Sequence, residues 1–373
     1  MPQNRKILIL TAGYGEGHNT AARSVRTGIE IVGEGKAEAR VLDLFEMSYG
    51  RMNKLTTKGY LAVINRAPKV WQKFYEMLDK TTLVEGTLFT MFKMSGLLGK
   101  IIAEQKPDAI VSTYPLYAFL LARLHPDKTR RNYVFATVVT DSITINSVWH
   151  RAPSDYFFLP NDATAEVMKR AGVPENKMKV LGFPVTPRFA KEAIDRPAPS
   201  ATVRPRVLFM INFGSREAPA LLRRLLAVNP NIDFTVTVGR DQALGARIAE
   251  AAKEANRKVE IFGWTDRMPE LVMSHHLLIS KAGGATVQEA TAAKTPMIIS
   301  QVIPGQEEGN ARLIVENGCG RISETHEAIS ASVAETFKDD ARLWRTWNAN
   351  ITKISRPAAA LEIAEFVLQT TEK

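Results

Sequence analysis

The sequence contains a single cysteine, Cys319, among its 373 residues. One cysteine excludes an internal disulfide and indicates a reducing compartment. No second cysteine or histidine lies near it at the spacing of metal ligands, so we interpret Cys319 as a buried structural thiol.

Long hydrophobic runs are also missing. A membrane-spanning helix needs about 18 to 20 uninterrupted apolar residues, and the longest candidate, residues 109–124, is interrupted by Ser112 and Pro115. The apolar run Ile7–Leu10 is too short for the core of a signal peptide, and a glycine-rich turn follows it directly. We therefore expect a cytoplasmic chain that reaches a membrane only from its surface.

Motifs for metal binding are absent from the sequence. There is no Asp-x-Asp motif and no histidine and cysteine cluster with metal spacing. His275 and His276 are adjacent and would point apart on a regular element, so we interpret both as structural. We expect no metal and no other cofactor.

Acidic residues are the minority among the charges. Lys and Arg number 49 against 39 Asp and Glu, which gives a net charge of +10 and a pI near 9.6. Such a balance favours an anionic partner: nucleic acid, anionic lipid or a phosphorylated substrate. Zinc-finger spacing and signatures of the RNP and KH types are missing, so we expect no nucleic acid.

Short, continuous apolar runs recur along the chain, each followed by turn residues and a helical period. Continuous hydrophobicity indicates strands that are buried on both faces, which is typical of parallel α/β sheets. A proline-rich segment, residues 190–205, separates two doubly wound halves, and ligands are expected outside the carboxyl ends of the strands, in a cleft between the halves. The predicted strands are residues 6–11, 39–44, 109–112, 134–139, 156–159, 179–182, 206–211, 233–238, 258–262, 277–280 and 296–300.

Gly13, Gly15 and Gly17 follow the first predicted strand and precede a helix that we expect to begin near Asn19–Thr20. Such a loop approaches a ligand closely, and the helix N-terminus offers unpaired N–H groups. The spacing differs from G-x-G-x-x-G, and Asp43 at the end of the second strand is not clearly placed for a ribose. A nicotinamide dinucleotide site is therefore disfavoured.

His18 comes directly after these glycines. A histidine at a strand-to-helix turn accepts a hydroxyl proton near neutral pH, so we predict that His18 is a general base. The alternative is a helix-capping or packing histidine. Asp141, at another strand end of the same half, is the rival base.

The second half repeats the pattern of strand, glycine turn and helix. A strand ends at Ser280, Gly283 and Gly284 turn the chain, and a helix is expected to begin near Ala285–Thr286. The N-terminal amides and dipole of this helix suit a diphosphate, and Thr286 adds a hydroxyl. Glu289 is placed to accept hydrogen bonds from ribose hydroxyls; the alternative is a carboxylate that only favours the helix dipole.

The next strand leads to Pro304-Gly305-Gln306-Glu307, with Asn310 close behind. Amide and carboxylate side chains at a strand end suit a sugar ring, because between them they donate to and accept from its hydroxyls. The alternative is a solvated loop.

Taken together, these motifs resemble the monogalactosyldiacylglycerol synthases and processive diacylglycerol glucosyltransferases of glycosyltransferase family 28, which are related to the peptidoglycan N-acetylglucosaminyltransferase. The resemblance covers nearly the whole chain. It rests on the segments LILTAGYGEGH, VVTD with Trp149-His150, VLGFPVTPRF, IFGW, KAGGATVQEA and IPGQEEGN.

The resemblance implies an α/β GT-B fold, in which two Rossmann-like domains face each other across a cleft. It also implies an inverting, metal-independent transfer of a hexose from a UDP-sugar to diacylglycerol or a related glycolipid. By position, the catalytic candidates are His18 and Asp141, and the glycine loop of Gly13, Gly15 and Gly17 lies on the acceptor side. The implied donor contacts are Gly214, Ser215, Phe262, Gly263, Trp264, Gly283, Gly284, Ala285, Thr286, Glu289, Gln306, Glu307 and Asn310.

The same resemblance divides the chain into regions. Residues 1–190 are expected to form the acceptor and membrane-binding domain, 191–205 a linker, 206–355 the UDP-sugar domain, and 356–373 a C-terminal helix that packs back on the N-terminal domain.

Residues 51–106 are basic and contain amphipathic helical periods. Cationic faces with aromatic stripes suit anionic bilayers, so we predict a peripheral location on the inner face of the cell membrane. The stripe from Val84 to Ile101 is equally compatible with packing on the domain core. The membrane contacts that we favour are Trp71, Lys73, Phe74 and Tyr75.

Three alternatives remain open. A UDP-sugar epimerase with the same architecture would need neither acceptor nor membrane. Transfer of N-acetylglucosamine to another lipid would preserve the chemistry, and a non-catalytic UDP-sugar-binding regulator would not need His18, Asp141 and Glu289 together.

Overall fold

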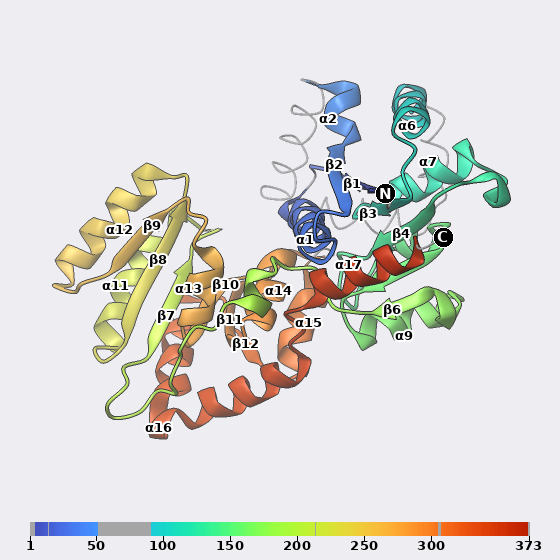
Figure 1. Cartoon of the computed structure of the whole chain (residues 1–373). Helices are drawn as coiled ribbons and strands as arrows, with labels where there is room; N and C mark the ends of the chain where they lie inside the picture. The colour runs from blue at the N-terminus through green and yellow to red at the C-terminus, as the bar shows by residue number, and fades with distance from the viewer. Residues whose placement is uncertain (1–3, 14, 51–90, 213, 305–306, 372–373) are drawn as a thin grey trace. The chain divides into compact units, whose positions relative to one another are not determined.

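The computed structural model describes residues 4–13, 15–50, 91–212, 214–304 and 307–371. The chain forms two compact units (Figure 1). The first unit consists of Met1–Pro187, Ile303–Gly309 and Arg356–Lys373, and the second of Arg188–Val302 and Asn310–Ser355. Two of the predicted membrane contacts, Trp71 and Lys73, lie outside the described residues, as do Phe74, Tyr75 and Gln306.

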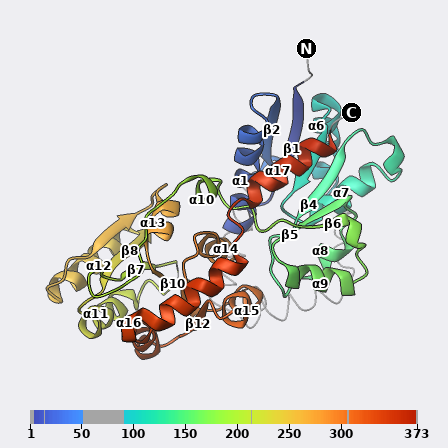
Figure 2. The same cartoon turned by 60° about the horizontal axis from the view of Figure 1, so that its bottom comes forward.

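A parallel sheet of six strands forms the centre of the first unit, in the order β2-β1-β3-β4-β5-β6. Figure 1 labels β3, and Figure 2 labels the other strands of this sheet. The side chains of Ile7–Leu10 are at most 2% exposed, which is the burial on both faces that continuous hydrophobicity predicts. Its strands are β1 (Arg5–Thr11), β2 (Ala37–Asp43), β3 (Ala109–Ser112), β4 (Val134–Val138), β5 (Tyr156–Leu159) and β6 (Met178–Val180).

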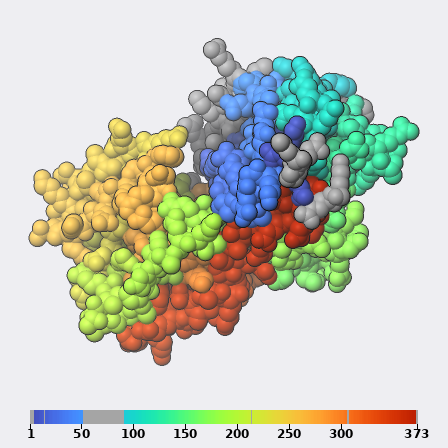
Figure 3. All heavy atoms as spheres, in the orientation of Figure 1, coloured from blue at the N-terminus to red at the C-terminus, as the bar shows by residue number. Residues whose placement is uncertain are grey.

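Helices cover this sheet, and two of them come from distant parts of the sequence. α1 (Glu16–Val32) packs on α17 (Ala359–Thr370), as the space-filling view shows (Figure 3). Gly28 permits this approach, because a Cβ there would collide with the carbonyl of Ala360. The other helices in the described part of the unit are α2 (Leu44–Tyr49), α6 (Phe92–Gln105), α7 (Leu116–Leu124), α8 (Ser147–Arg151), α9 (Asp162–Arg170), η2 (Lys128–Arg130) and η3 (Glu175–Lys177).

The second unit is built on another parallel six-stranded sheet, in the order β12-β11-β10-β7-β8-β9. Its strands are β7 (Arg206–Met210), β8 (Asp233–Gly239), β9 (Glu260–Gly263), β10 (Leu277–Lys281), β11 (Met297–Gln301) and β12 (Gly320–Ile322). Its helices are α10 (Arg188–Lys191), α11 (Ala218–Val228), α12 (Gln242–Glu254), α13 (Met268–Ser274), α14 (Gly284–Ala292), α15 (Glu308–Glu316) and α16 (His326–Ile354).

The segment between α10 and β7 has no regular structure, but it is held on the second unit. The Arg196 guanidinium donates to the carbonyls of His275 and Lys294 at 2.9 and 2.8 Å. His276 Nε2 donates to the carbonyl of Pro197 at 3.0 Å. These bonds hold Arg196 and Pro197 on the unit, although most residues of the segment are exposed.

The interpretation of His275 and His276 as structural is confirmed. His275 Nδ1 donates to the carbonyl of Leu271 at 2.6 Å, and its Nε2 lies 2.8 Å from Thr235 Oγ1. His276 Nδ1 accepts from the Arg206 N–H at 2.9 Å. Burial lowers the pKa of each histidine to about 4, so both are neutral near pH 7.

Cys319 is buried, as predicted, and burial raises the pKa of its thiol to about 12. The apolar stripe from Val84 to Ile101 was compatible with either membrane contact or core packing. In its described part it packs on the core, since Leu98 and Ile101 of α6 are buried. Phe92, by contrast, is 64% exposed and lies under the guanidinium of Arg123.

One expectation about the elements was wrong, and one strand was not predicted. α1 begins at Glu16 with Gly15 as its N-cap, not near Asn19–Thr20, because a glycine cap allows the helix to start inside the glycine loop. The short strand β12 was not predicted, because three residues give too little periodicity to detect.

Candidate functional site

The carboxyl ends of β1, β3 and β4 bring together the catalytic candidates of the first unit. β1 leads to the glycine loop and α1, β3 leads to Thr113, and β4 leads to Thr140 and Asp141. The strand order reverses between β1 and β3, which is where such sheets bind ligands. These groups are far apart in the sequence, and they meet because parallel strands end at the same edge of the sheet.

The glycine loop is fixed by Asp43. The N–H of Gly13 donates to Asp43 Oδ2 at 2.9 Å, while Asp43 Oδ1 caps α2 by accepting from Glu46 N–H at 3.0 Å. Both carboxylate oxygens of Asp43 are therefore engaged by the backbone. A Cβ added at Gly15 or at Gly17 would stand in open space, so neither glycine packs against another group at that position.

His18 lies in the first turn of α1 and is partly buried. Its Nδ1 is 2.7 Å from the carbonyl oxygen of Thr113 and 2.9 Å from Thr140 Oγ1. A carbonyl oxygen only accepts, so Nδ1 carries the proton and the lone pair of the neutral ring is on Nε2. The nitrogen of His18 that is available to take up a proton is therefore Nε2.

Asp141 acts electrostatically on this ring. Burial lowers the pKa of His18, and the Asp141 carboxylate raises it in part. Burial also raises the pKa of Asp141, against the opposing influence of His18 and of the Trp149 indole N–H, which donates to Asp141 Oδ2 at 2.7 Å. The structure therefore brings both catalytic candidates into one electrostatic pair.

Residues that sequence reasoning missed complete this arrangement. The Thr113 carbonyl fixes the tautomer of His18, the Thr140 hydroxyl contacts the same ring nitrogen, and Trp149, only 2% exposed, holds Asp141. Tyr114 packs its ring edge-on against His18 with centroids 5.1 Å apart. The segment VVTD with Trp149 was visible in the sequence, but the hydrogen bond between indole and carboxylate was not.

In the second unit, the predicted diphosphate site is the N-terminus of α14. Its N-cap is Gly283, which has no side chain that could cap the first amides of the helix. Gly284 begins the helix, one residue before the expected start. Ala285 and Thr286 follow in the first turn, and Glu289 is partly buried one turn further along.

This helix begins where the strand order of the second sheet reverses, between β7 and β10. Asn212, which follows β7, donates from Nδ2 to Ser280 Oγ of β10 at 3.0 Å and so joins the two strand ends. Sequence reasoning missed Asn212. Gly214, predicted beside the diphosphate, has φ of +65°, which favours glycine, and the Ser215 carbonyl accepts from Arg247 at 3.2 Å.

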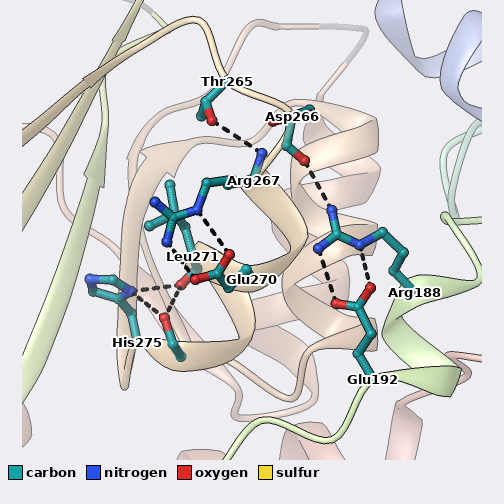
Figure 4. Close-up of polar contacts among 9 residues, drawn as sticks. Arg188, Glu192, Thr265, Asp266, Arg267, Glu270, Leu271 and His275 are labelled. Carbon is teal, nitrogen blue, oxygen red and sulfur yellow. Dashed lines mark hydrogen bonds and ion pairs between the residues drawn. The ribbon is translucent and has the colours of Figure 1, made fainter.

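The segment Phe262–Trp264 was predicted to meet the uracil. Trp264 is 67% exposed, with the guanidinium of Arg240 5.5 Å from its ring centroid. Arg267 lies over the Phe262 ring at 5.5 Å and pairs with Glu270. Figure 4 shows this pair beside the contact of Arg188 with the Asp266 carbonyl, which ties α10 to the loop before α13. The exposed Gly263 separates the two rings.

Asn310 and Glu307, predicted to contact the sugar, are both engaged by the backbone. Asn310 Nδ2 donates to the carbonyl of Ala282 at 3.1 Å, and its buried Oδ1 has no hydrogen-bond partner among the described residues. Glu307 Oε2 accepts from the Ile303 N–H at 3.1 Å. Glu307 belongs to the first unit and Asn310 to the second.

Comparison with known proteins places this geometry in context. The family model of monogalactosyldiacylglycerol (MGDG) synthase matches residues 18–185, and that of the glycosyltransferase family 28 C-terminal domain matches residues 210–359. A processive diacylglycerol β-glucosyltransferase of Bacillus subtilis is 26% identical over all of this chain and 97% of its own length. A probable chloroplastic monogalactosyldiacylglycerol synthase of Glycine max is 26% identical over 96% of this chain and 70% of its own.

Solved structures share the fold. Acinetobacter baumannii MurG superposes with a TM-score of 0.63 at 15% identity, covering 98% of this chain and 99% of its own. UDP-GlcNAc 2-epimerase from Neisseria meningitidis, bound to UDP-GlcNAc, gives 0.61 at 12% identity, covering 98% and 100%. The predicted α/β GT-B fold is confirmed by these likenesses and by the two six-stranded sheets.

Proposed function

The chain belongs to the family of the monogalactosyldiacylglycerol synthases and family 28 glycosyltransferases, and from this premise we propose that it transfers a hexose from a UDP-sugar to diacylglycerol or a related membrane glycolipid. One observation carries the proposal: the Thr113 carbonyl fixes the proton of His18 on Nδ1 and leaves Nε2 as the base. A glycosyl transfer to a hydroxyl requires such a base.

In the proposed reaction, the acceptor hydroxyl oxygen forms a bond to the anomeric carbon from the face opposite UDP. The bond between that carbon and the diphosphate oxygen breaks, so the configuration inverts and UDP leaves with the electron pair. The hydroxyl proton passes to His18 Nε2. The nearby Asp141 carboxylate stabilises the imidazolium that forms, as a buried counter-charge does.

The departing UDP needs stabilisation, and the amides at the start of α14 can supply it without a metal. The glycine turn Gly283-Gly284 lets the diphosphate approach, and the helix dipole favours its negative charge. Glu289 is assigned to the ribose hydroxyls, and Phe262–Trp264 to the uracil. Glu307, Asn310 and Gln306 are assigned to the sugar.

The main alternative is a UDP-sugar epimerase. Fold likeness does not separate the two, because both a MurG and an epimerase superpose on the chain at similar TM-scores. The full-length curated relatives favour the transferase, since they act on diacylglycerol by name. They equally disfavour N-acetylglucosamine transfer to a different lipid and a non-catalytic regulator.

A lipid acceptor requires access to a membrane surface. No helix among the described residues is both long and apolar enough to span a bilayer. We propose a peripheral location on the inner face of the cell membrane, supported by the net charge of +10 and by the basic, aromatic-rich segment that contains Trp71 and Lys73. Exposed Phe92, beside Arg123, adds an apolar and a basic group where the described chain resumes after that segment.

Product analysis tests the function directly. Purified protein is mixed with UDP-glucose, UDP-galactose and UDP-N-acetylglucosamine and with vesicles that contain diacylglycerol, and the lipids and nucleotides are identified by mass spectrometry. The proposal expects a glycosylated diacylglycerol together with free UDP, and neither with the His18→Ala variant. An isomerised UDP-sugar formed without lipid would identify an epimerase instead.

A further inference from the structure

A strained turn follows Asp141 directly. Ile143 has φ of +58°, a left-handed conformation that β-branched residues rarely adopt. The Thr144 N–H donates to the Ser142 carbonyl at 2.7 Å, which closes a three-residue γ-turn around Ile143. Such a conformation persists only where the surrounding structure imposes it.

The N-terminus of α9 imposes it. Asn161 Nδ2 donates to Ser142 Oγ at 2.7 Å, and the Ile143 N–H donates to Thr164 Oγ1 at 2.9 Å. Asn161 is also the N-cap of α9, because its Oδ1 accepts from the Thr164 N–H at 2.9 Å. Ser142, Ile143 and Thr164 are all nearly or completely buried. The turn is therefore tied to α9 by two hydrogen bonds, one of them buried and the other partly buried.

The residues just before this turn lie beside His18, the proposed base. Thr140 contacts His18 Nδ1, and Asp141 accepts from the Trp149 indole. Four consecutive residues, 140–143, thus face His18 with their first two members and α9 with their last two. Any relaxation of the turn would rotate the backbone that carries Asp141.

We propose that Asn161 and Ser142 are positioning residues that hold Asp141 beside His18 through the γ-turn at Ile143. The proposal rests on the proposed function, in which His18 is the base. Neither residue touches a substrate. Their hydrogen bond keeps the strained turn closed, and the closed turn fixes the carboxylate that stabilises the imidazolium.

Two substitutions remove this hydrogen bond from opposite ends. Ser142→Ala deletes the acceptor and leaves the cap of α9 intact. Asn161→Ser keeps a good helix cap but is too short to reach Ser142. Because misplacing a catalytic group by about 1 Å lowers rates by up to ~100-fold, we expect each variant to lose about 10- to 100-fold in turnover. The double variant should lose no more than either single one, since both break one bond.

The pH profile separates positioning from mere loss of structure. Asp141 is the carboxylate that acts on the His18 ring, and Tyr114 is the phenol packed against it. With Asp141 displaced, the pKa of His18 falls, so the acid limb of kcat/KM moves to lower pH. Partial unfolding would lower kcat/KM at every pH and would leave the pH of its acid limb unchanged. Thr325→Ser, at the N-cap of α16 in the second unit, is the matched control. It should leave kcat/KM and the pH of its acid limb unchanged.

NMR titration of the His18 ring detects the displacement of Asp141 in the absence of substrate. The ring signals are assigned by comparison with the His18→Ala variant. We expect a lower His18 pKa in Ser142→Ala and in Asn161→Ser than in the unsubstituted protein, in folded samples with unaltered UDP affinity. An unchanged His18 pKa in both variants would overturn the proposal. If the unsubstituted protein transfers no sugar to diacylglycerol, the proposed function fails, and the titration still decides whether Asn161 and Ser142 position Asp141.

Discussion

His18 Nδ1 and the carbonyl oxygen of Thr113 lie 2.7 Å apart, in a hydrogen bond that spans the β1 and β3 ends of the first sheet. The bond decides which ring nitrogen can act as a base, because only Nε2 then has a lone pair in the neutral ring. It also explains how a helix-borne histidine keeps one orientation. The rotation of the ring is restricted by Thr113, Thr140 and the edge of Tyr114.

The first prediction concerns this base. We expect His18→Ala to lower turnover by at least ~100-fold, because a general base contributes about 10²- to 10⁴-fold. UDP affinity should stay within about threefold, since the assigned donor contacts lie mainly in the second unit. Turnover is measured by UDP release and affinity by calorimetry.

His125→Ala, at the C-cap of α7, is the matched histidine control and should keep full turnover. Should His18→Ala retain most of its turnover while Asp141→Asn loses it, the base is Asp141 and His18 only orders the loop.

The second prediction concerns Glu289 on α14. We expect Glu289→Ala to weaken UDP binding by about 1 to 3 kcal/mol, the range for unmade hydrogen bonds to a charged group. The melting temperature should change little, because Glu289 is only partly buried. Calorimetric titration with UDP measures the effect, with Glu250→Gln at an exposed position of α12 as the control. Unchanged UDP affinity in Glu289→Ala would show that the ribose is bound elsewhere.

The third prediction concerns stability in acid. His275 and His276 have folded-state pKa values of about 4, below the ordinary value near 6.5, so the unfolded chain binds more protons between these values. Their contribution to stability is fully present above about pH 6.5 and is lost as the pH falls toward 4. One pKa unit corresponds to about 1.4 kcal/mol, so we expect each of these buried histidines to cost stability on the order of 3 kcal/mol over this pH range.

Protonation of His276 at Nδ1 would place a second donor against the Arg206 N–H. The variant His276→Asn keeps an acceptor there and does not titrate, so its urea midpoint should depend less on pH between 6.5 and 4. A variant as acid-sensitive as the unsubstituted protein would locate the effect elsewhere, and His125→Asn serves as the control.

The fourth prediction concerns membrane attachment. Binding to vesicles should require anionic lipid and weaken as salt rises, because exposed charges are screened beyond about 10 Å at 0.1 M salt. Lys73→Glu should lower the partition coefficient by about tenfold or more, at ~1 kcal/mol for each basic residue near the surface. Lys253→Glu on α12 is the charge-matched control. Sedimentation that is independent of salt and of lipid charge would contradict electrostatic attachment.

The strands were predictable because burial on both faces leaves a strong trace in the sequence. β3 and β5 have the predicted bounds, and the other predicted strands shift by one or two residues at one or both ends. The start of α1 was wrong because the glycine spacing that indicates a loop also permits an early helix start. Local sequence cannot distinguish these two outcomes.

The candidate site was predictable in its residues and not in its contacts. His18 and Asp141 could be named from their places after strands, since parallel strands end at one edge. The Thr113 carbonyl, the Trp149 indole and the strained Ile143 could not, because each depends on a long-range approach of backbone or on a left-handed conformation that this residue type disfavours. The positions of Trp71 and Gln306 stay predictions.

The packing of α17 on α1 has a consequence for how the chain is made. The first unit needs Gly28 against Ala360, and Arg5 of β1 donates to Leu368 and Thr371. These partners lie beyond the whole second unit in the sequence, so during synthesis the second unit can complete its sheet while one face of α1 still awaits its cover. The first unit therefore begins synthesis first but completes its fold last. A chain interrupted after Ser355 would present an uncovered apolar face of α1 to chaperones and to other chains.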